Sequence, residues 1–168
     1  MCIRDRFKVD AMSASSMVAV DLDNDYIYFD ENKDDKRLIA SITKIMTAIV
    51  TIENIDIDKE ITVGKEVLKA YGSAIYINVG EKITIRDLLY GLIMRSGNDA
   101  AVVLAQNVAG SMEGFVHLMN ELASNIGMKN SNFVNAHGLE ENDGSANYST
   151  AYDICLLYTS PSPRDRTR

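Results

Sequence analysis

The segment from Asp99 to Ala109 most constrains the fold, because it is apolar on nearly every side. A helix that is apolar all round must be buried among other elements, and Gly110 is a typical residue for its C-terminal end. The sequence therefore predicts a central helix surrounded by the rest of a globular domain. Its apolar members are Ala100, Ala101, Val102, Val103, Leu104, Ala105 and Val108.

Other helices are predicted on both sides of this segment. Thr84 is placed as the N-cap of a helix whose apolar stripe stops before Ser96. Ser111 is placed as the N-cap of a helix that ends near Gly127. A last helix is expected to open at Ser149, after a polar loop that is rich in glycine and asparagine.

Strands are predicted mainly near the N-terminus. Residues 16–22 and 26–29 are both strand candidates, and the aspartates and asparagine between them favour a turn. The two segments are therefore predicted to form a hairpin. Short strands are also predicted at residues 60–63 and 74–77. The three aspartates around the first turn do not make a calcium loop, because Tyr26 stands where that loop needs glycine.

Composition excludes several classes of protein. The 168 residues, 46% of them hydrophobic and 24% charged, are typical of one soluble globular domain. The net charge of −7 argues against nucleic-acid binding. No apolar run approaches the roughly 20 residues that span a membrane, and no signal peptide follows Met1. Cys2 and Cys155 suggest neither a metal site nor a disulfide framework.

Ser41 and Lys44 stand three residues apart at the start of another predicted helix. Each helical residue turns about 100°, so the two side chains should lie about 60° apart on one side of the helix. They would sit at the edge of the apolar stripe that is expected to face the core. That stripe comprises Ile42, Ile45, Met46, Ile49 and Val50.

Such a pair can form an activated nucleophile. A serine hydroxyl is a poor nucleophile until a base takes its proton, and a neutral lysine amine can be that base. Burial and the positive end of a helix both favour the neutral amine. Free N–H groups at the same helix end can bind a developing oxyanion. The alternative is structural, with Ser41 as an N-cap and Lys44 as a solvated residue.

A second polar motif, Ser96 to Asn98, lies between two strongly apolar helices. A serine and a carboxamide on such a rigidly held loop can relay a proton and bind a peptide amide. The structural alternative is a helix end followed by an N-cap. Ser145 and Asn147 match the same Ser-x-Asn pattern, but they lie in a loop with no apolar frame.

The order and context of these motifs resemble the D-alanyl-D-alanine carboxypeptidases, the low-molecular-weight penicillin-binding proteins. Ser-x-x-Lys opens a helix and Ser-x-Asn follows 55 positions later (96 − 41), as in the motif set of β-lactamases and penicillin-binding proteins. Longer strings narrow the resemblance to this family, over about residues 16–154. They are residues 40–48 (ASITKIMTA), 96–101 (SGNDAA), 135–139 (NAHGL) and 148–153 (YSTAYD).

The resemblance implies an α/β (α+β) fold of the β-lactamase/transpeptidase type, an antiparallel sheet flanked by helices plus a helical subdomain. It implies Ser41 as the acylated nucleophile, Lys44 as its general base and Ser96 as a proton relay. Asn98 would contact the peptide amide of the substrate. No metal and no cofactor are implied. His137 is given a structural role, and a surface position is expected for His117.

The implied activity removes the terminal D-alanine from peptidoglycan pentapeptides, outside the cytoplasm. The implied partners are stem peptides ending in D-Ala-D-Ala, with β-lactams as covalent inhibitors, and no nucleic acid. One alternative is a serine β-lactamase, which needs an efficient deacylating base, but Glu140 and Glu141 lack an asparagine four residues later. Another alternative is a non-catalytic penicillin-binding protein of the cell wall.

One motif of the set is absent, because no Lys-Thr-Gly occurs anywhere in the chain. In the family that strand lines the site, binds the terminal carboxylate and helps complete the oxyanion hole. We therefore expect residues 7–154 to be the N-terminal part of a catalytic domain whose C-terminal strands are missing. Residues 1–6 and about 155–168 are expected to be foreign tails, the alternative being natural flexible ones. Any membrane association would involve the missing segments.

Overall fold

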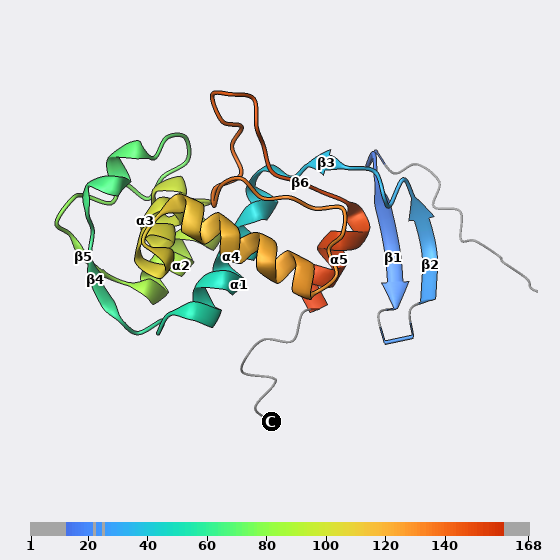
Figure 1. The fold of residues 1–168 in the computed structure, drawn as a ribbon, viewed down its shortest axis with the longest axis horizontal. Helices are drawn as coiled ribbons and strands as arrows, with labels where there is room; N and C mark the ends of the chain where they lie inside the picture. Colours follow the sequence, from blue (N-terminus) through green and yellow to red (C-terminus); the bar gives the residue numbers. More distant parts are fainter. Residues whose placement is uncertain (1–12, 22, 25, 160–168) are drawn as a thin grey trace, which may run out of the picture.

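The computed structural model describes residues 13–21, 23–24 and 26–159 (Figure 1). The predicted tail at residues 1–6 and residues 160–168 of the other tail lie outside them. The helices are α1 (Thr43–Asn54), α2 (Ile85–Met94), α3 (Asn98–Ala109), α4 (Met112–Asn125) and α5 (Ala151–Thr159), with 3₁₀ turns η1 (Ala40–Ile42) and η2 (Lys65–Lys69). The strands are β1 (Met17–Asp21), β2 (Tyr26–Glu31), β3 (Arg37–Leu38), β4 (Glu60–Thr62), β5 (Lys82–Thr84) and β6 (Tyr148–Ser149).

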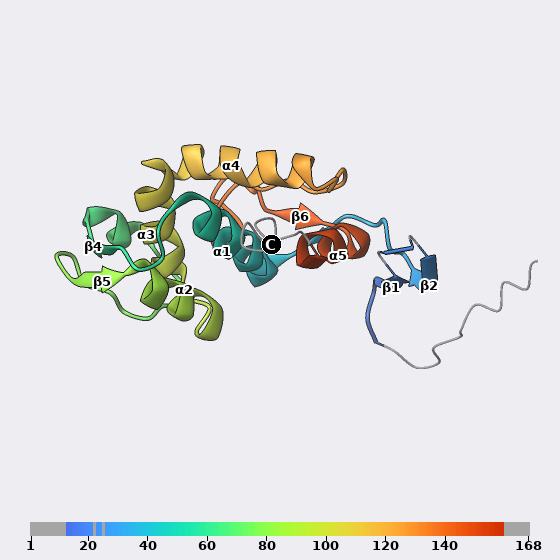
Figure 2. The same cartoon turned by 90° about the horizontal axis from the view of Figure 1, so that it is seen from below.

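Helix α3 is the centre of the helical part, as its sequence predicts. Every residue from Asn98 to Ala105 is buried. Helices α1, α2 and α4 and the turn η2 all pack against it. Figure 2 shows α4 lying along one side of the molecule, with α1 and α3 beneath it. Gly110 ends α3 with a φ of 75°, a left-handed conformation that glycine adopts without steric cost.

The predicted helix caps are confirmed. The side chain of Thr84 accepts a hydrogen bond from the backbone N–H of Asp87 at the start of α2. Ser111 does the same for the N–H of Gly114 at the start of α4. These contacts satisfy backbone donors that a helix end otherwise leaves unpaired.

Within the described residues the strands form three two-stranded antiparallel sheets, β1–β2, β3–β6 and β4–β5. The predicted N-terminal hairpin is confirmed, with Met17 opposite Glu31 and Asp21 opposite Tyr26. It lies at the opposite end of the molecule from β4 and β5, next to α5 (Figures 1 and 2). The fold thus mixes helices with small antiparallel sheets, in agreement with the predicted α/β (α+β) class.

The strand predicted at residues 74–77 is wrong. The backbone N–H groups of Ile75 and Ile77 donate to the carboxylate of Asp99 and not to a neighbouring strand. Tyr76 between them has a φ of 64°, which is incompatible with an extended strand. A side chain distant in sequence therefore overrides the local β propensity.

The helix that follows Ser41 begins later than predicted, and only part of the predicted apolar stripe is buried. Ser41 lies in η1, and α1 starts at Thr43. Ile42 and Ile45, assigned to the core-facing stripe, are 45% and 39% exposed. The buried face of α1 instead includes its threonines, because a polar loop packs there and bonds to them. The buried residues are Thr43, Lys44, Met46, Thr47, Val50 and Thr51.

Helix α5 extends beyond residue 154, where the foreign tail was expected to begin. It runs to Thr159, and Leu157 is only 1% exposed within the hydrophobic core. The short strands β3 and β6, which no local pattern predicted, join the segment before Ser41 to the segment before α5. No helix in the described part of the chain is both long and apolar enough to cross a membrane.

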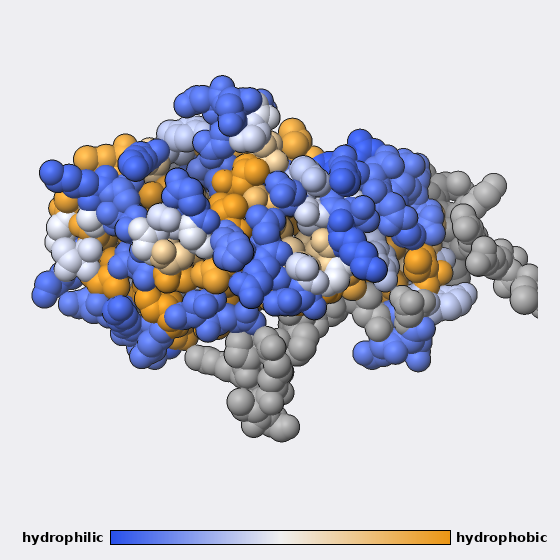
Figure 3. Space-filling model, in the orientation of Figure 1, coloured by the Kyte–Doolittle hydropathy of each residue, from blue (hydrophilic) through white to orange (hydrophobic). Residues whose placement is uncertain are grey.

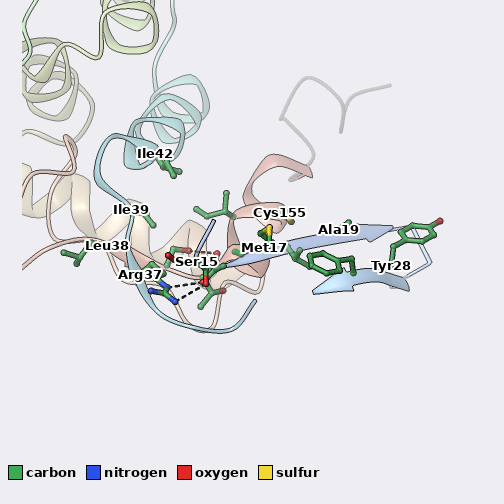
Figure 4. A pocket seen from close by; sticks show the side chains of 16 residues that line it. Ser15, Met17, Ala19, Tyr28, Arg37, Leu38, Ile39, Ile42 and Cys155 are labelled. Atoms are coloured by element: carbon green, nitrogen blue, oxygen red, sulfur yellow. Dashed lines mark hydrogen bonds between the residues drawn. The ribbon is translucent and has the colours of Figure 1, made fainter. Parts of the chain in front are cut away.

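A cavity of about 840 Å³ opens between the hairpin, β3 and α5. Met17, Ala19 and Tyr28 line it from the hairpin, Leu38 and Ile42 from the opposite side (Figure 4). The lining is mostly apolar, and Leu38 is 68% exposed. On the face shown in Figure 3, hydrophobic residues are otherwise visible mainly over the helical part, between hydrophilic ones.

Candidate active site

Three of the four predicted site residues meet where η1 approaches the turn between α2 and α3. The Nζ atom of Lys44 lies 3.3 Å from Ser41 Oγ. Ser96 Oγ donates a hydrogen bond to Ser41 Oγ over 3.1 Å. The two motifs, 55 positions apart in sequence, therefore converge on one hydroxyl. Ser41 is exposed and accessible to a ligand, whereas Lys44 is buried.

The backbone is strained on both sides of this contact. Ala40, directly before Ser41, has a φ of 44°, and Ser96 has a φ of 55°. Residues with side chains rarely adopt this left-handed region, and such strain costs about 1–3 kcal/mol at each position. The surrounding packing holds the two hydroxyls in place against this cost.

Lys44 is oriented by a main-chain oxygen. Its Nζ donates a hydrogen bond of 2.8 Å to the carbonyl oxygen of His137. The side chain is only 3% exposed, and its burial lowers the pKa of Lys44 from 10.5 to about 8. About a tenth of the amine is therefore neutral at pH 7, far more than for a solvated lysine. With one N–H directed at His137, its lone pair can face Ser41.

This pKa predicts how acylation depends on pH. Only the neutral amine of Lys44 can take the proton of Ser41, so the rate of acylation should rise as pH increases toward about 8 and level off above it. Well below that pH the rate should fall about tenfold per unit. The measurement is the second-order rate constant for penicillin acylation of the complete protein between pH 5 and pH 10. A rate that stays flat across pH 6–8 would contradict this role.

The loop that supplies the His137 carbonyl is fixed along α1. Thr47 Oγ1 donates to the carbonyl oxygen of Ala136 over 2.7 Å. Asn147 Nδ2 donates to Thr43 Oγ1 over 2.9 Å. Gly138, with a φ of 86°, lies so close to η1 that a Cβ there would be 1.9 Å from the oxygen of Ala40. The threonine face of α1 is buried because it binds this loop.

Asn98 begins α3, two residues after Ser96. Its Nδ2 donates to the carbonyl oxygen of Tyr71 over 2.6 Å. Among the described residues no donor reaches its buried Oδ1. An unpaired buried acceptor is costly unless a ligand supplies a donor. The amide oxygen of Asn98 is therefore an acceptor without a partner among the described residues.

The second Ser-x-Asn match, Ser145 and Asn147, lies in the loop that packs along α1. Asn147 is 1% exposed, and its Oδ1 accepts from the backbone N–H groups of Val134 and Asn135. It joins the loop to α1 and does not meet the hydroxyl of Ser41. A polar network around Asn147 orders this loop.

The backbone amides just after Ser41 are already used. The N–H of Ile42 donates to the oxygen of Ile39 over 3.0 Å, and the N–H of Thr43 donates to η1 carbonyls. These two amides are therefore not among the free N–H groups expected near Ser41. The 3₁₀ turn η1, which contains Ser41, satisfies both of them.

The two histidines have the positions expected of them. His117 is exposed on α4. His137 is buried; its Nδ1 accepts from the N–H of Leu139, and its ring meets the ring of Tyr71 edge-on at 5.8 Å. Burial lowers the pKa of His137, against the opposing charge of Glu141. In residues 13–21, 23–24 and 26–159 no three His, Cys, Asp or Glu side chains are grouped as metal ligands.

Sequence reasoning missed three contributors to the site. The His137 carbonyl and the Tyr71 carbonyl are main-chain atoms, so no side-chain motif could reveal them. Asp99 was assigned only to the central helix, although its carboxylate binds a distant loop. Its charge at the start of an otherwise apolar helix was the one available signal.

The chain is similar to known proteins in sequence. Residues 4–162 match the family model of the peptidase S11 family, described as D-alanyl-D-alanine carboxypeptidase. D-alanyl-D-alanine carboxypeptidase DacF of Bacillus subtilis is 34% identical over 152 residues, covering 88% of this chain and 38% of that protein. DacC of Escherichia coli is 35% identical over 158 residues, covering 88% and 39%. This chain thus spans less than half the length of these relatives.

Solved structures agree with the sequence comparisons. The D-alanyl-D-alanine carboxypeptidase DacD from Francisella tularensis superimposes with a TM-score of 0.83 at 34% identity, over 92% of this chain and 39% of that one. The D-alanyl-D-alanine carboxypeptidase from Mycobacterium tuberculosis gives a TM-score of 0.86 at 25% identity, over 94% and 59%. The fold is therefore of the penicillin-binding-protein type, and this chain belongs to the peptidase S11 family of D-alanyl-D-alanine carboxypeptidases.

Proposed function

We propose that the complete protein is a serine-type D-Ala-D-Ala carboxypeptidase. Its substrate would be a peptidoglycan stem peptide ending in D-Ala-D-Ala, and β-lactams would acylate the same serine. The observation that carries the proposal is the position of Ser41 Oγ, 3.3 Å from the buried amine of Lys44 and 3.1 Å from Ser96 Oγ. Family membership adds the substrate class.

The proposed reaction has two stages. Lys44 takes the proton of Ser41 as Oγ attacks the carbonyl carbon of the terminal peptide bond. The proton then passes through Ser96 to the nitrogen of the departing D-alanine. Asn98 Oδ1 accepts a peptide N–H of the substrate and holds the chain in line. Water finally hydrolyses the ester on Ser41 and releases the shortened peptide.

The substrate implies a place of action. Peptidoglycan lies outside the cytoplasm, so we propose that the complete protein works in the cell envelope. No cofactor takes part in the proposed steps, since Ser41, Lys44, Ser96 and Asn98 provide the nucleophile, base, relay and substrate contact.

A serine β-lactamase is the first alternative. A Glu-x-x-x-Asn spacing of the kind that class A deacylation uses occurs at Glu121 and Asn125. Both residues are exposed on α4, and neither takes part in the hydrogen bonds that join Ser41, Lys44 and Ser96. The second alternative is a non-catalytic penicillin-binding protein, which would be labelled by penicillin without releasing D-alanine.

The apolar cavity beside the hairpin is the space that the missing segment would occupy. Exposed apolar residues line it, and a two-stranded hairpin has unpaired edges. We propose that downstream strands of the complete protein fill this space and carry the Lys-Thr-Gly motif, which would bind the carboxylate of the substrate.

The test compares residues 7–154 with the same chain extended by its natural downstream sequence. The extended protein should release D-alanine from diacyl-Lys-D-Ala-D-Ala and form a penicillin adduct. The short chain should be at least 10²–10³-fold slower, the typical loss on removing one oxyanion donor, and prone to aggregate. Labelling of the extended protein without D-alanine release would favour the non-catalytic alternative. Equal turnover by the short chain would refute the assignment of the missing strand.

A further inference from the structure

We propose that Asp99 is a positioning residue of this reaction. Its carboxylate clamps residues 71–77 onto the start of α3, and the clamped segment fixes the direction in which Asn98 presents its amide oxygen. The inference rests on the proposed function, because it concerns how the substrate's peptide is held. It uses contacts that involve neither Ser41 nor Lys44.

The carboxylate of Asp99 binds the backbone N–H groups of the loop at residues 75–77. It is 3% exposed and accepts the N–H of Ile75 at 3.1 and 3.0 Å and the N–H of Ile77 at 3.2 Å. It also accepts the N–H of Ala100 at 2.9 Å. Tyr76 lies between the two loop donors in a left-handed conformation with φ 64°. Successive N–H groups around such a residue form a concavity that binds anions.

The same segment is attached to α3 at further points. The N–H of Asn98 donates to the carbonyl oxygen of Ser73 over 2.7 Å. The side chain of Ile75 fills space that two glycines leave open. A Cβ on Gly91 would lie 2.4 Å from it, and one on Gly97 would lie 3.3 Å from it. The loop therefore packs closely against residues 96–98 only while its backbone is bonded to α3 and the side chain of Ile75 lies against the two glycines.

The clamped loop sets the orientation of the Asn98 amide. The carbonyl of Tyr71 can only accept, so the NH₂ group of Asn98 must face it across 2.6 Å. The oxygen of the same amide then points the other way, and no described residue donates to it. If the Tyr71 carbonyl moves, the amide loses the bond that fixes its orientation.

A carboxylate suits this position better than an amide of the same size. Both oxygens of Asp99 accept backbone N–H groups. In Asp99→Asn one oxygen becomes an NH₂ group, which would face another donor. The substitution therefore breaks at least one clamp contact with little change in volume, and leaves Asn98 itself intact.

The first test is kinetic, on the complete protein. Asp99→Asn should lower kcat/KM for diacyl-Lys-D-Ala-D-Ala by about 10- to 100-fold, the range for losing a hydrogen bond to a charged group. The matched control is Asp87→Asn, which removes an exposed first-turn carboxylate from α2 that bonds Thr84. The control should change kcat/KM less than twofold. An unchanged kcat/KM in Asp99→Asn would overturn the proposal.

The second test separates positioning from general stability. If Asp99 acts through Asn98, Asp99→Asn should have less than about threefold effect in an Asn98→Ala background, because coupled residues are not additive. Fold-changes that simply multiply would overturn the proposal. Hydrogen exchange of residues 71–77 should also accelerate in Asp99→Asn, and this readout does not depend on activity.

Two glycine-to-alanine variants provide a further test if Asp99→Asn fails to fold. Gly72 is exposed, with φ 81°, and a Cβ there would lie 2.9 Å from Asn98 Nδ2. Gly72→Ala should therefore lower kcat/KM about tenfold by displacing the amide. Gly80→Ala has the same backbone strain, with φ 85° and open space around a Cβ, and should not. Equal effects of the two alanines would overturn the proposal, whereas an inactive wild-type protein would refute only the proposed function.

Discussion

Replacing Ser41 by alanine in the complete protein is expected to lower D-alanine release by roughly 10⁶-fold, the loss typical of removing a serine nucleophile. The acyl-enzyme cannot form without this Oγ, which is the hydroxyl that Lys44 Nζ contacts at 3.3 Å. The measurement is D-alanine release under substrate excess.

The matched control is Ser124→Ala, an exposed position near the end of α4. It should retain full turnover. Substantial turnover by Ser41→Ala would mean that another group is the nucleophile, and that the contact between Ser41 and Lys44 is structural.

Replacing Lys44 by arginine is expected to lower the rate of penicillin acylation by at least about 10²-fold, the usual loss when general-base catalysis is removed. Arginine keeps the positive charge but does not lose its proton in proteins. The guanidinium is also larger than the amine that now donates to the His137 carbonyl over 2.8 Å. Stopped-flow or quenched labelling with penicillin measures the rate.

Lys129→Arg, at an exposed position, is the control for the chemical change itself. Its acylation rate should equal that of the wild type. A near-normal rate in Lys44→Arg would show that a fixed cation is sufficient, and that no neutral amine is needed.

The sequence predicts the helices well, because apolar segments and helix caps depend on residues that are close together in the chain. The apolar segment after Asp99 forms the buried centre, and Thr84 and Ser111 cap the helices expected of them. The spacing of Ser41 and Lys44 also predicts their contact, since a 3₁₀ turn and an α-helix both bring residues three apart together.

What the sequence does not predict depends on contacts between distant segments. Residues 74–77 look like a strand, but Asp99, more than twenty positions away, takes their N–H groups. Ile42 and Ile45 look like core residues, but the loop bonded to Thr47 occupies the buried face of α1. In each case a polar side chain binds the backbone of another segment, and such contacts leave no periodic pattern.

The most direct test of the central claim is mass analysis of the complete protein after treatment with a β-lactam. We predict one covalent adduct per chain, located by peptide mapping to the peptide that contains Ser41 and absent from Ser41→Ala. An adduct that persists in Ser41→Ala, or that maps to a peptide without Ser41, would contradict the assignment of Ser41 as the nucleophile.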